Sequence, residues 1–539
     1  MPSPRWVAVF LLLLTSFACI DSTGPALNTP PFVDVGATEA ALPASFDGPF
    51  EGAVSKAAQR AAASRVALPR EFLNFSMPVV SGRSIMVPAG GNLQRALNSA
   101  QRGDEIVLTA GATYTGNFVL PVKAGTAANG WIIIRSDKAS ELPAAGTRVS
   151  PSQSSLMATI ETPNVSPAIK TSGPSSGWWL VGLEVTVSPA LTAQQYGIIT
   201  LGEGQRTLDA VPQDLVLDRM YVHGQTTTNV SRCVAINSGR TQITDSYISE
   251  CHGKDFDSQA IAGWNGPGPF KIVNNMLMGS GENLMFGGAD PGVPGLIPSD
   301  IEIRRNYLYT PLSWKGVWLK KNLFETKNAV RVLVEENVFD GSWTHGQTGW
   351  AIILKSENQS GGCRWCRTAD VTIRRNLIRN AGAGISIAPR TNGADSTTSR
   401  ILISENVLEN IGVAPYDGDK RGFQLLTQTH AVTIERTVLT GNLAAALILD
   451  GGAPCTFTDN VWSAGSYGIF ASGGLMGTGA LTGGCGANNW RWSGMTMVGS
   501  SRGNVYPAGT TWVSSESQAG RAAQIRAAVR NATAGVDIP

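Results

Sequence analysis

The feature that most constrains this fold is a short phrase that recurs through the C-terminal two thirds of the chain. Each copy is a run of β-branched residues, a polar pair that usually ends in Asn, and a second short apolar run. The clearest copies carry Asn275, Asn306, Asn337, Asn376, Asn406 and Asn460, and weaker ones carry Asp218-Arg219, Asp245-Ser246 and Arg436-Thr437. Successive copies lie roughly 25–40 residues apart, a spacing that is typical of solenoids and propellers.

Each interval holds several short strands and almost no helical periodicity. Short strands with one apolar face cannot bury that face alone, but stacked coils share one core. Asn tolerates the left-handed backbone of a sharp bend, and recurring Asn amides can form a hydrogen-bonded ladder from coil to coil. A β-propeller is the alternative, but its blades need about 40–50 residues each. We therefore predict an all-β fold made of stacked parallel coils.

Two segments are suited to cover the ends of such a stack. The stretch from Asn92 to Gln101 predicts a short amphipathic helix with Leu93, Ala96, Leu97 and Ala100 on one face. The Ala/Arg-rich stretch 514–532 has helical character near the other end. Covered ends protect strand edges that would otherwise aggregate. We predict a β-helix over residues 81–515 and a helical C-terminal cap or tail over residues 516–539.

The stretch NLQRALNSAQRGDEIVLTAGATYTGNFVL (residues 92–120), followed by the Asn-ended repeats, resembles the pectin lyase-like superfamily. Residues 281–309 also resemble secreted bacterial members of that group. The resemblance covers about residues 80–515 and implies a right-handed parallel β-helix. It does not fix an activity, because that superfamily includes polysaccharide lyases, glycoside hydrolases, carbohydrate epimerases and adhesins.

The N-terminus predicts export. Residues 1–19 contain one positive charge, a short apolar run and small residues, as secretory signals do. Cleavage before Cys19 would instead leave a lipid-anchored cysteine at the outer membrane or cell surface, and free secretion is the other outcome. Residues 20–80 are rich in Ala, Pro, Ser, Gly and Thr, which favours a flexible tether. The net charge of +2, with no Lys/Arg-rich block, argues against a nucleic-acid partner.

Six cysteines besides Cys19 agree with an oxidising compartment. Nearest-neighbour pairing would join 233 to 251, 363 to 366 and 455 to 485, one of fifteen possible connectivities. Cys363 and Cys366 could instead supply half of a zinc site. No second Cys/His pair in the sequence has matching spacing, which makes zinc the weaker interpretation.

Polar residues gather between about positions 250 and 360, where other coils carry Gly, Ser and Ala. Aligning the strands after the Asn turns places Lys320 next to Lys355 in one outward file. The alternative is a solvated surface with minor ion pairs. Because exposed Trp next to charged groups favours recognition, we expect substrate contacts from the following residues: Trp264, Asn265, Glu282, Trp318, Asn322, Glu357 and Arg390.

An acidic polysaccharide could be cleaved here by β-elimination, which needs a base and a group that neutralises the sugar carboxylate. Lys320 or Lys355 could act as the base if its pKa is lowered, and His252 is the rival. Asp255, Asp257 and Asp290, with Glu282, could bind Ca²⁺. Taken alone, Asp255 and Asp257 are better explained as turn residues that bond nearby amides.

Hydrolysis is the second enzymatic possibility, with Asp257 and either Glu282 or Asp290 as the carboxylate pair. The adjacent-Asp and Gly-His-Gly pattern of polygalacturonases and the Arg-rich signature of pectate lyases are not recognisable in the sequence. A non-catalytic binding or adhesive module is the alternative from another class. We therefore expect an exported monomer whose partner is an extracellular polysaccharide, with β-elimination favoured narrowly.

Overall fold

The computed structural model describes residues 66–450 and 452–537. Every described residue belongs to one compact unit. The predicted signal, Cys19 and most of the predicted tether lie outside the described residues. None of the helices in the described ranges is long and apolar enough to cross a membrane.

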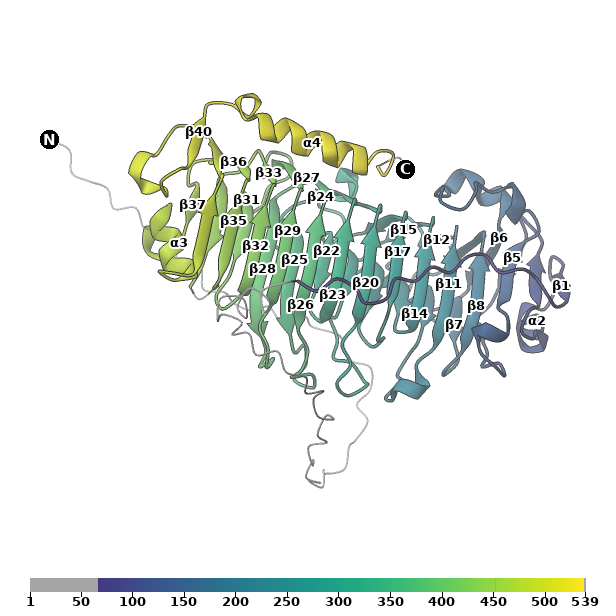
Figure 1. Ribbon diagram of the computed structural model, residues 1–539. Helices are drawn as coiled ribbons and strands as arrows, with labels where there is room; N and C mark the ends of the chain where they lie inside the picture. The colour runs from purple at the N-terminus through teal and green to yellow at the C-terminus, as the bar shows by residue number, and fades with distance from the viewer. Residues whose placement is uncertain (1–65, 451, 538–539) are drawn as a thin grey trace, which may run out of the picture. The chain divides into compact units, whose positions relative to one another are not determined.

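From its first strand onward, this unit winds into coils whose strands join three parallel sheets (Figure 1). Sheet 1 has 14 strands: β1 (Ser84–Val87), β2 (Glu105–Leu108), β5 (Ile132–Ser136), β8 (Ser176–Val181), β11 (Gln213–Asp218), β14 (Gly239–Thr244), β17 (Phe270–Val273), β20 (Ser299–Arg304), β23 (Ala329–Glu335), β26 (Thr368–Arg374), β29 (Ser399–Ser404), β32 (His430–Glu435), β35 (Cys455–Thr458) and β38 (Trp490–Ser493).

Sheet 2 also has 14 strands: β3 (Thr113–Thr115), β6 (Ala158–Thr162), β9 (Leu183–Val187), β12 (Tyr221–His223), β15 (Tyr247–Cys251), β18 (Met276–Gly279), β21 (Tyr307–Tyr309), β24 (Val338–Ser342), β27 (Leu377–Ala381), β30 (Val407–Ile411), β33 (Val438–Leu439), β36 (Val461–Ser463), β39 (Thr496–Val498) and β40 (Thr511–Val513).

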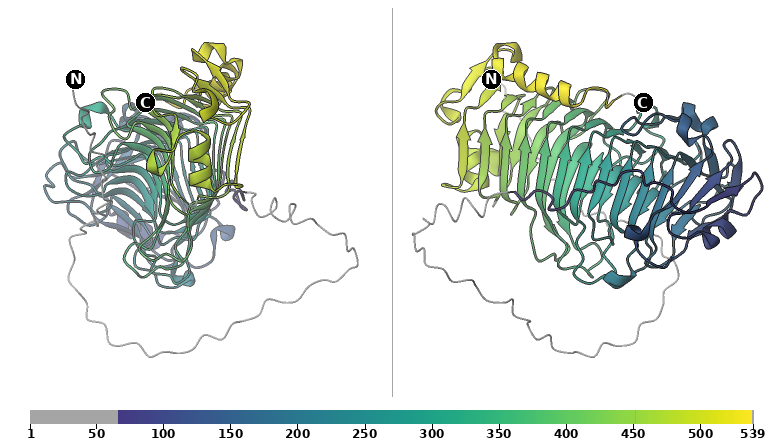
Figure 2. Two further views of the ribbon diagram at one scale, coloured as in Figure 1. Left: turned by 90° about the vertical axis from the view of Figure 1, so that its left-hand side faces the viewer. Right: turned by 45° about the vertical axis from the view of Figure 1, so that its right-hand side comes forward.

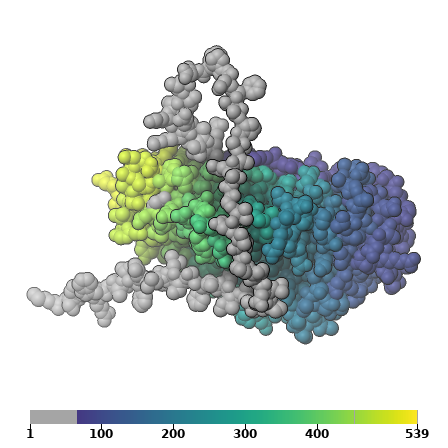
Figure 3. Space-filling view, turned by 90° about the horizontal axis from the view of Figure 1, so that it is seen from below, coloured from purple at the N-terminus to yellow at the C-terminus, as the bar shows by residue number. Residues whose placement is uncertain are grey.

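Sheet 3 has 12 strands: β4 (Phe118–Leu120), β7 (Ile169–Thr171), β10 (Ile199–Leu201), β13 (Arg232–Ile236), β16 (Gln259–Gly263), β19 (Glu282–Phe286), β22 (Phe324–Thr326), β25 (Trp350–Glu357), β28 (Ala383–Thr391), β31 (Arg421–Leu425), β34 (Ala444–Ile448) and β37 (Ile469–Phe470). Figures 2 and 3 show that the coils follow one another along the stack in chain order. The predicted right-handed parallel β-helix is confirmed.

Three α-helices and several 3₁₀ helices are present in the described ranges. The α-helices are α2 (Leu93–Ser99), α3 (Thr478–Cys485) and α4 (Gly520–Ala532). The 3₁₀ helices are η1 (Ala127–Asn129), η2 (Ala139–Glu141), η3 (Pro151–Leu156), η4 (Leu208–Ala210), η5 (Leu312–Trp314), η6 (Ser472–Gly474), η7 (Gly503–Val505) and η8 (Glu516–Gln518). Helix α2 is the predicted N-terminal capping helix: Asn92 caps it, and Leu93, Ala96 and Leu97 are buried. Helix α4 instead packs on the outer face of sheet 2, where Ile525 and Val529 contact valines of β30, β33 and β36.

The predicted asparagine ladder is present between sheets 1 and 2. Each amide from Asn275 to Asn376 donates to the next asparagine at 2.9–3.1 Å, ending on Asn406. The left-handed residue is not the asparagine, as the sequence suggested, but the residue before it, for example Arg305 (φ 55°) and Glu336 (φ 59°). Its side chain therefore faces outward while the asparagine satisfies buried backbone groups.

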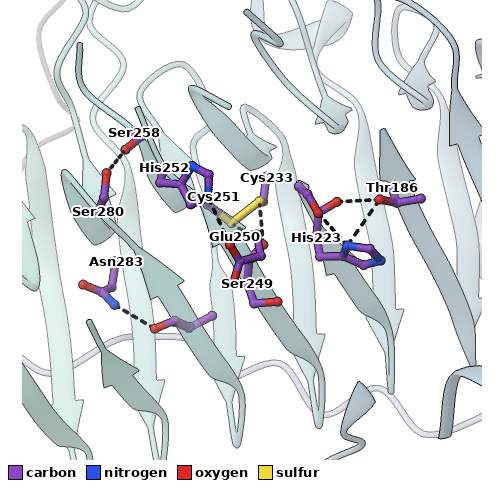
Figure 4. Close-up of a disulfide and its surroundings, with 12 residues drawn as sticks. Thr186, His223, Cys233, Ser249, Glu250, Cys251, His252, Ser258, Ser280 and Asn283 are labelled. Carbon is purple, nitrogen blue, oxygen red and sulfur yellow. Dashed lines mark hydrogen bonds and ion pairs between the residues drawn. A yellow bond between two sulfur atoms is a disulfide. The ribbon is translucent and has the colours of Figure 1, made fainter. Parts of the chain in front are cut away.

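The three cysteine pairs form as nearest-neighbour pairing predicts, namely Cys233–Cys251, Cys363–Cys366 and Cys455–Cys485. The first of them joins β13 of sheet 3 to β15 of sheet 2 (Figure 4). It lies directly before the loop 252–258. This loop leads into β16, and the disulfide therefore fixes where the loop begins.

Residues 66–80, which the composition assigned to the tether, lie along the outer face of sheet 1. The Ala67 and Arg70 amides donate to Asp370 and Asp300, and Gln242 donates to the Phe75 carbonyl. In Figure 1 this dark segment crosses the strands of sheet 1 on its way to β1. Residues 66–80 therefore cover part of the outer face of sheet 1. The polar site lies on the outer face of sheet 3.

Candidate functional site

A bend near the start of most sheet 3 strands determines which side chains face outward. Two successive residues point into the core there, for example Ala260 with Ile261 and Leu323 with Phe324. In β19, the amides of Asn283 and Leu284 both donate to the Leu323 carbonyl, as expected for a β-bulge. The residue before each inward pair and the residue after it then lie on the outer face.

Along strands β16 to β25 and the segments that flank them lies a group of charged side chains that we call the ionic cluster. Its members are Asp257, Glu282, Lys321, Glu325, Lys327, Lys355 and Glu357. Lys321 Nζ lies 2.8 Å from Asp257 Oδ2 and 3.1 Å from Glu282 Oε1. Lys355 Nζ lies 2.7 Å from Glu357 Oε2 and 3.5 Å from Glu325 Oε1.

Neutral amides extend the ionic cluster. Gln259 Nε2 donates to Glu282 Oε2 at 2.7 Å, and Asn322 Nδ2 donates to Glu325 Oε2 at 2.9 Å. Glu282 and Glu325 are fully buried, whereas 19% of the Lys355 side chain is exposed. Of the three lysines in the cluster, Lys355 is therefore the one that a ligand on the outer face meets first.

Burial and neighbouring charges push the two fully buried carboxyl groups in opposite directions. Burial raises the pKa of Glu282, and the attraction of Lys321 only partly offsets it. Burial also acts to raise the pKa of Glu325, but Lys355, Lys327 and Lys321 outweigh it and lower that pKa to about 2. Glu325 is therefore the carboxylate that stays ionised, and Glu282 is the one that holds a proton more readily.

Lys321 is the central cation of the ionic cluster. Burial acts to lower its pKa, but Glu282, Asp257 and Glu325 together outweigh burial and raise that pKa well above its ordinary value. Removing a partner from such a buried pair leaves an uncompensated charge. Lys321 is thus an ammonium ion that holds the carboxylates together, and it is not suited to accept a proton.

Lys320 is not in the outward file with Lys355, contrary to the sequence alignment. The strand of its coil is Phe324–Thr326, and the register places Phe324 and Thr326 beside Ile352 and Leu354. Lys320 is fully buried, and its Nζ donates to Thr310 Oγ1 and the Asn322 carbonyl at 2.8 Å. Burial lowers its pKa to about 7. It anchors the loop before Asn322 and is shielded from any ligand.

His252 and Trp318 are also placed differently from the prediction. The His252 ring stacks on Trp318 at 3.7 Å between centroids, and Trp314 contacts it edge-on at 5.0 Å. His252 is fully buried and lies 3.0 Å from Glu250 (Figure 4). His252 and Trp318 are therefore packed against each other inside the protein. On the outer face they supply neither a base nor an aromatic surface for a sugar ring.

The remaining predicted residues lie either in loops or at exposed positions. Asp290 accepts from the Ser360 and Gly362 amides, and Asn265 bonds the Gln205 carbonyl and the Val293 amide. Asp255 is exposed. Arg390 is also exposed, and it lies beside Ser356 in the register of β25 and β28.

The predicted calcium ligands Asp255, Asp257 and Asp290 therefore do not converge, since Asp257 pairs with Lys321. Across residues 66–450 and 452–537, no group of three or more His, Cys, Asp or Glu side chains is arranged to hold a metal ion. Two amide oxygens of the site, Gln259 Oε1 and Asn322 Oδ1, nevertheless lack a hydrogen-bond donor within the described structure, and Glu325 Oε1 has the Lys355 ammonium only at 3.5 Å.

Three members of the ionic cluster were missed by sequence reasoning, namely Lys321, Glu325 and Lys327. The available signal was the triplet Phe324-Glu325-Thr326, in which a charged residue separates two inward positions. The stretch Val317–Leu319 is more apolar, and the sequence pattern therefore predicts the strand there instead.

No protein-family model matches this chain, and no curated protein matches it. Among solved structures, an alginate lyase from Paenibacillus sp. str. FPU-7 is 16% identical with a TM-score of 0.33, covering 76% of this chain and 97% of that one. A mannuronic acid specific polysaccharide family 6 lyase from human gut microbiota is 11% identical with a TM-score of 0.46, covering 85% and 99%. Pectate lyase Pel9A is 10% identical with a TM-score of 0.22, covering 73% and 78%. The fold is established by this chain's own sheets, and its function is argued below from its side chains.

Proposed function

We propose that this chain is an exported protein that binds an acidic polysaccharide along the outer face of sheet 3 and cleaves it by β-elimination at the ionic cluster. The observation that carries the proposal is the row of lysines interleaved with buried carboxyl groups on successive strands. Cations favour a polymer whose sugars carry carboxylates. Clustered titratable groups with displaced pKa values also occur preferentially at functional sites.

In the proposed reaction, Lys355 is the base and Arg390 binds the carboxylate of the sugar being attacked. A guanidinium suits a carboxylate because its two N–H groups match the two oxygens. Arg390 extends from the strand beside Lys355; its Nη1 donates to the Asp395 carbonyl at 3.0 Å, and no acidic side chain is paired with it in the described structure. Its charge is thus not neutralised by a carboxylate, and its other N–H groups can meet a ligand that lies next to the exposed end of Lys355.

In the proposed reaction, Lys355 and Glu357 account for every proton that is transferred. As the substrate displaces water, Lys355 passes one proton to Glu357, which lies within hydrogen-bond reach at 2.7 Å. The neutral amine takes the proton from C5 of the uronate, the C4–C5 double bond forms and the bond from C4 to the leaving oxygen breaks. The resulting ammonium then donates a proton to that oxygen, which restores the amine.

Calcium remains a candidate cofactor of this reaction, although not at the aspartates predicted from the sequence. Carboxylate and amide oxygens are the ligands that Ca²⁺ prefers, and Glu282, Asn322 and Glu325 carry oxygens of that type. These residues would hold the ion, and its charge would help to neutralise the sugar carboxylate. Lys321 supplies positive charge to Glu282 in any case.

The test is cleavage of a panel of polyuronates by the purified chain, with and without Ca²⁺, followed by the ultraviolet absorbance of the unsaturated product. Lys355→Arg keeps the charge but removes the base, so we expect the rate to fall by about 10²–10⁴-fold. Exposed Lys138→Arg, which lies outside the ionic cluster, is the matched control and should retain full activity. Equal rates for the two variants would remove Lys355 from the mechanism.

Hydrolysis is the second candidate, and the opposite pKa displacements of Glu282 and Glu325 favour it. One carboxyl group that holds a proton and one that stays ionised are the acid and base that a glycosidase needs. The same reaction mixtures distinguish the two activities. New reducing ends without ultraviolet absorbance would indicate hydrolysis and overturn β-elimination. Neither signal across the panel would leave a binding module.

A further inference from the structure

We propose that a second part of the site lies beside the ionic cluster on the N-terminal coils of sheet 3, where a hollow binds further uronate rings of the same polymer. This inference rests on the proposed function and extends it, because it names subsites away from the place of cleavage. The hollow has a volume of about 410 Å³, and its lining includes Lys170, Tyr196, Thr200, Arg232, Ala235 and Trp264.

Small side chains create the hollow. In the register of sheet 3, Thr200 lies beside Ala235, and Ala235 lies beside Ala262. The same outward file continues with Met285 and then Glu325, which are much larger. The floor is therefore low over β10, β13 and β16 and rises where the ionic cluster begins. Concave sites with a few polar groups on the walls are typical of ligand binding.

The walls of the hollow present a guanidinium and aromatic rings, which are the groups that bind an acidic sugar. The Arg232 guanidinium lies over the Trp264 ring, 4.9 Å from its centroid, and the Trp264 amide donates to Asn237 Oδ1 at 2.9 Å. Tyr196 also lines the hollow and is 56% exposed, which is unusual for so large an aromatic side chain. Aromatic faces pack against the C–H faces of sugar rings, and a guanidinium binds carboxylates.

Lys170 adds a second cation at the far wall. Its ion pair with Glu203 is long, at 3.8 Å, and both side chains are largely exposed, so the pair is weak and can open for a ligand. With Arg232, Lys170 gives the hollow cationic groups on two strands, β7 and β13. A neutral polysaccharide would use the aromatic rings alone, whereas a polyuronate uses the rings and both cations.

The hollow and the ionic cluster are continuous along the sheet. Arg232 lies beside Gln259, Gln259 lies beside Glu282, and the Gln259 amide donates to Glu282 at 2.7 Å. Four steps between strands, of about 4.8 Å each, separate β7 from β19, so the two regions span about 19 Å. This length accommodates several sugar rings, and one extended chain can therefore occupy both regions at once.

The decisive experiment compares Tyr196→Ala with Tyr467→Ala, a tyrosine of similar exposure, 51%, near β37 at the other end of sheet 3. Polyuronate oligosaccharides of increasing length are tested for binding and for cleavage. For long oligosaccharides we expect Tyr196→Ala to raise Kd and KM about tenfold, which corresponds to about 1.4 kcal/mol, with kcat unchanged. The shortest oligosaccharide that is cleaved should show no change, and Tyr467→Ala should behave as the unmodified chain.

The outcomes separate this inference from the proposed function. Cleavage that Tyr196→Ala leaves unchanged at every length would overturn the subsites and leave β-elimination intact. Binding that is lost in Tyr196→Ala, in a chain that cleaves nothing, would support the subsites and overturn β-elimination. Neither binding nor cleavage by the unmodified chain would overturn both. Trp264→Phe, which retains an aromatic ring, should fold and lose less affinity than Tyr196→Ala.

Discussion

Sheets 1 and 3 both carry rows of charged residues on their outer faces, and on sheet 1 two Arg–Asp pairs are each joined by two hydrogen bonds. Arg331 binds both oxygens of Asp300 at 2.7 and 2.8 Å, and Arg400 binds both oxygens of Asp370 in the same way. Burial acts to raise the pKa of Asp300, but Arg331 and the Arg70 amide outweigh it and lower that pKa. These carboxylates have all the partners that they need.

On sheet 3 the lysines share the carboxyl groups unevenly. Lys321 divides its charge between Asp257 and Glu282, and two amide oxygens of the site have no hydrogen-bond donor in the described structure. The result is a raised pKa at Glu282 and a lowered one at Glu325. The comparison teaches that the number of ion pairs does not mark a functional face. Incomplete pairing under burial does not mark it either, because burial raises the pKa of Glu302 on sheet 1 despite Arg304 and Lys271. What distinguishes sheet 3 is that the buried Lys321 is shared between two carboxyl groups.

The largest expected effect on stability follows from Lys321→Met. This change leaves Asp257 and the buried Glu282 without their common cation, and breaking such a buried pair costs about 3–5 kcal/mol. The free energy of unfolding, measured with denaturant, should fall by that amount. Combining Lys321→Met with Glu282→Gln should restore most of the loss. A loss below about 1 kcal/mol would mean that the ion pairs of Lys321 contribute no more to the free energy of unfolding than a surface ion pair does.

Much of the fold could be predicted because its signals repeat. The asparagine ladder, the inward apolar positions and helix α2 each follow from local residue types that recur or are capped in a recognisable way. The cysteine pairs were one choice among fifteen, and proximity along the chain decided them. Repetition makes a small local preference visible, even when each copy alone would be ambiguous.

The site was harder to predict because its local structure departs from the repeat. Strand β22 has three residues, too few to show an alternating pattern, and the preceding loop turns inward around Trp314 and Trp318. The sequence located the polar region and named Glu282 and Lys355, but it placed Lys320 and His252 on the wrong side of the backbone. Bulges and inward loops depend on tertiary packing, which no single stretch of sequence displays.

A second prediction uses pH to sharpen the contrast between the two sheets. Burial lowers the pKa of Lys320 from 10.5 to about 7 in the folded chain, whereas the unfolded chain keeps the ordinary value. Between these values the unfolded chain binds the extra proton, so the free energy of unfolding rises as the pH increases from about 7 to about 10. Lys320→Met should lose this contribution and gain most over the unmodified chain below pH 7. Parallel pH profiles for the two proteins would show that Lys320 does not titrate in this range.

The smallest expected effect is on sheet 1, from Arg331→Met. Both partners of the Arg331–Asp300 pair are 17% exposed, and Asp300 keeps the Arg70 amide at 2.8 Å when the guanidinium is removed. The free energy of unfolding should fall by only about 1 kcal/mol, as for pairs near the surface. Cleavage of polyuronates should not change, because Arg331 lies on sheet 1 and the ionic cluster lies on sheet 3. A loss of stability as large as that caused by Lys321→Met would show that the completely paired Arg331–Asp300 pair matters as much for stability as the ionic cluster does. The two faces would then differ in activity alone.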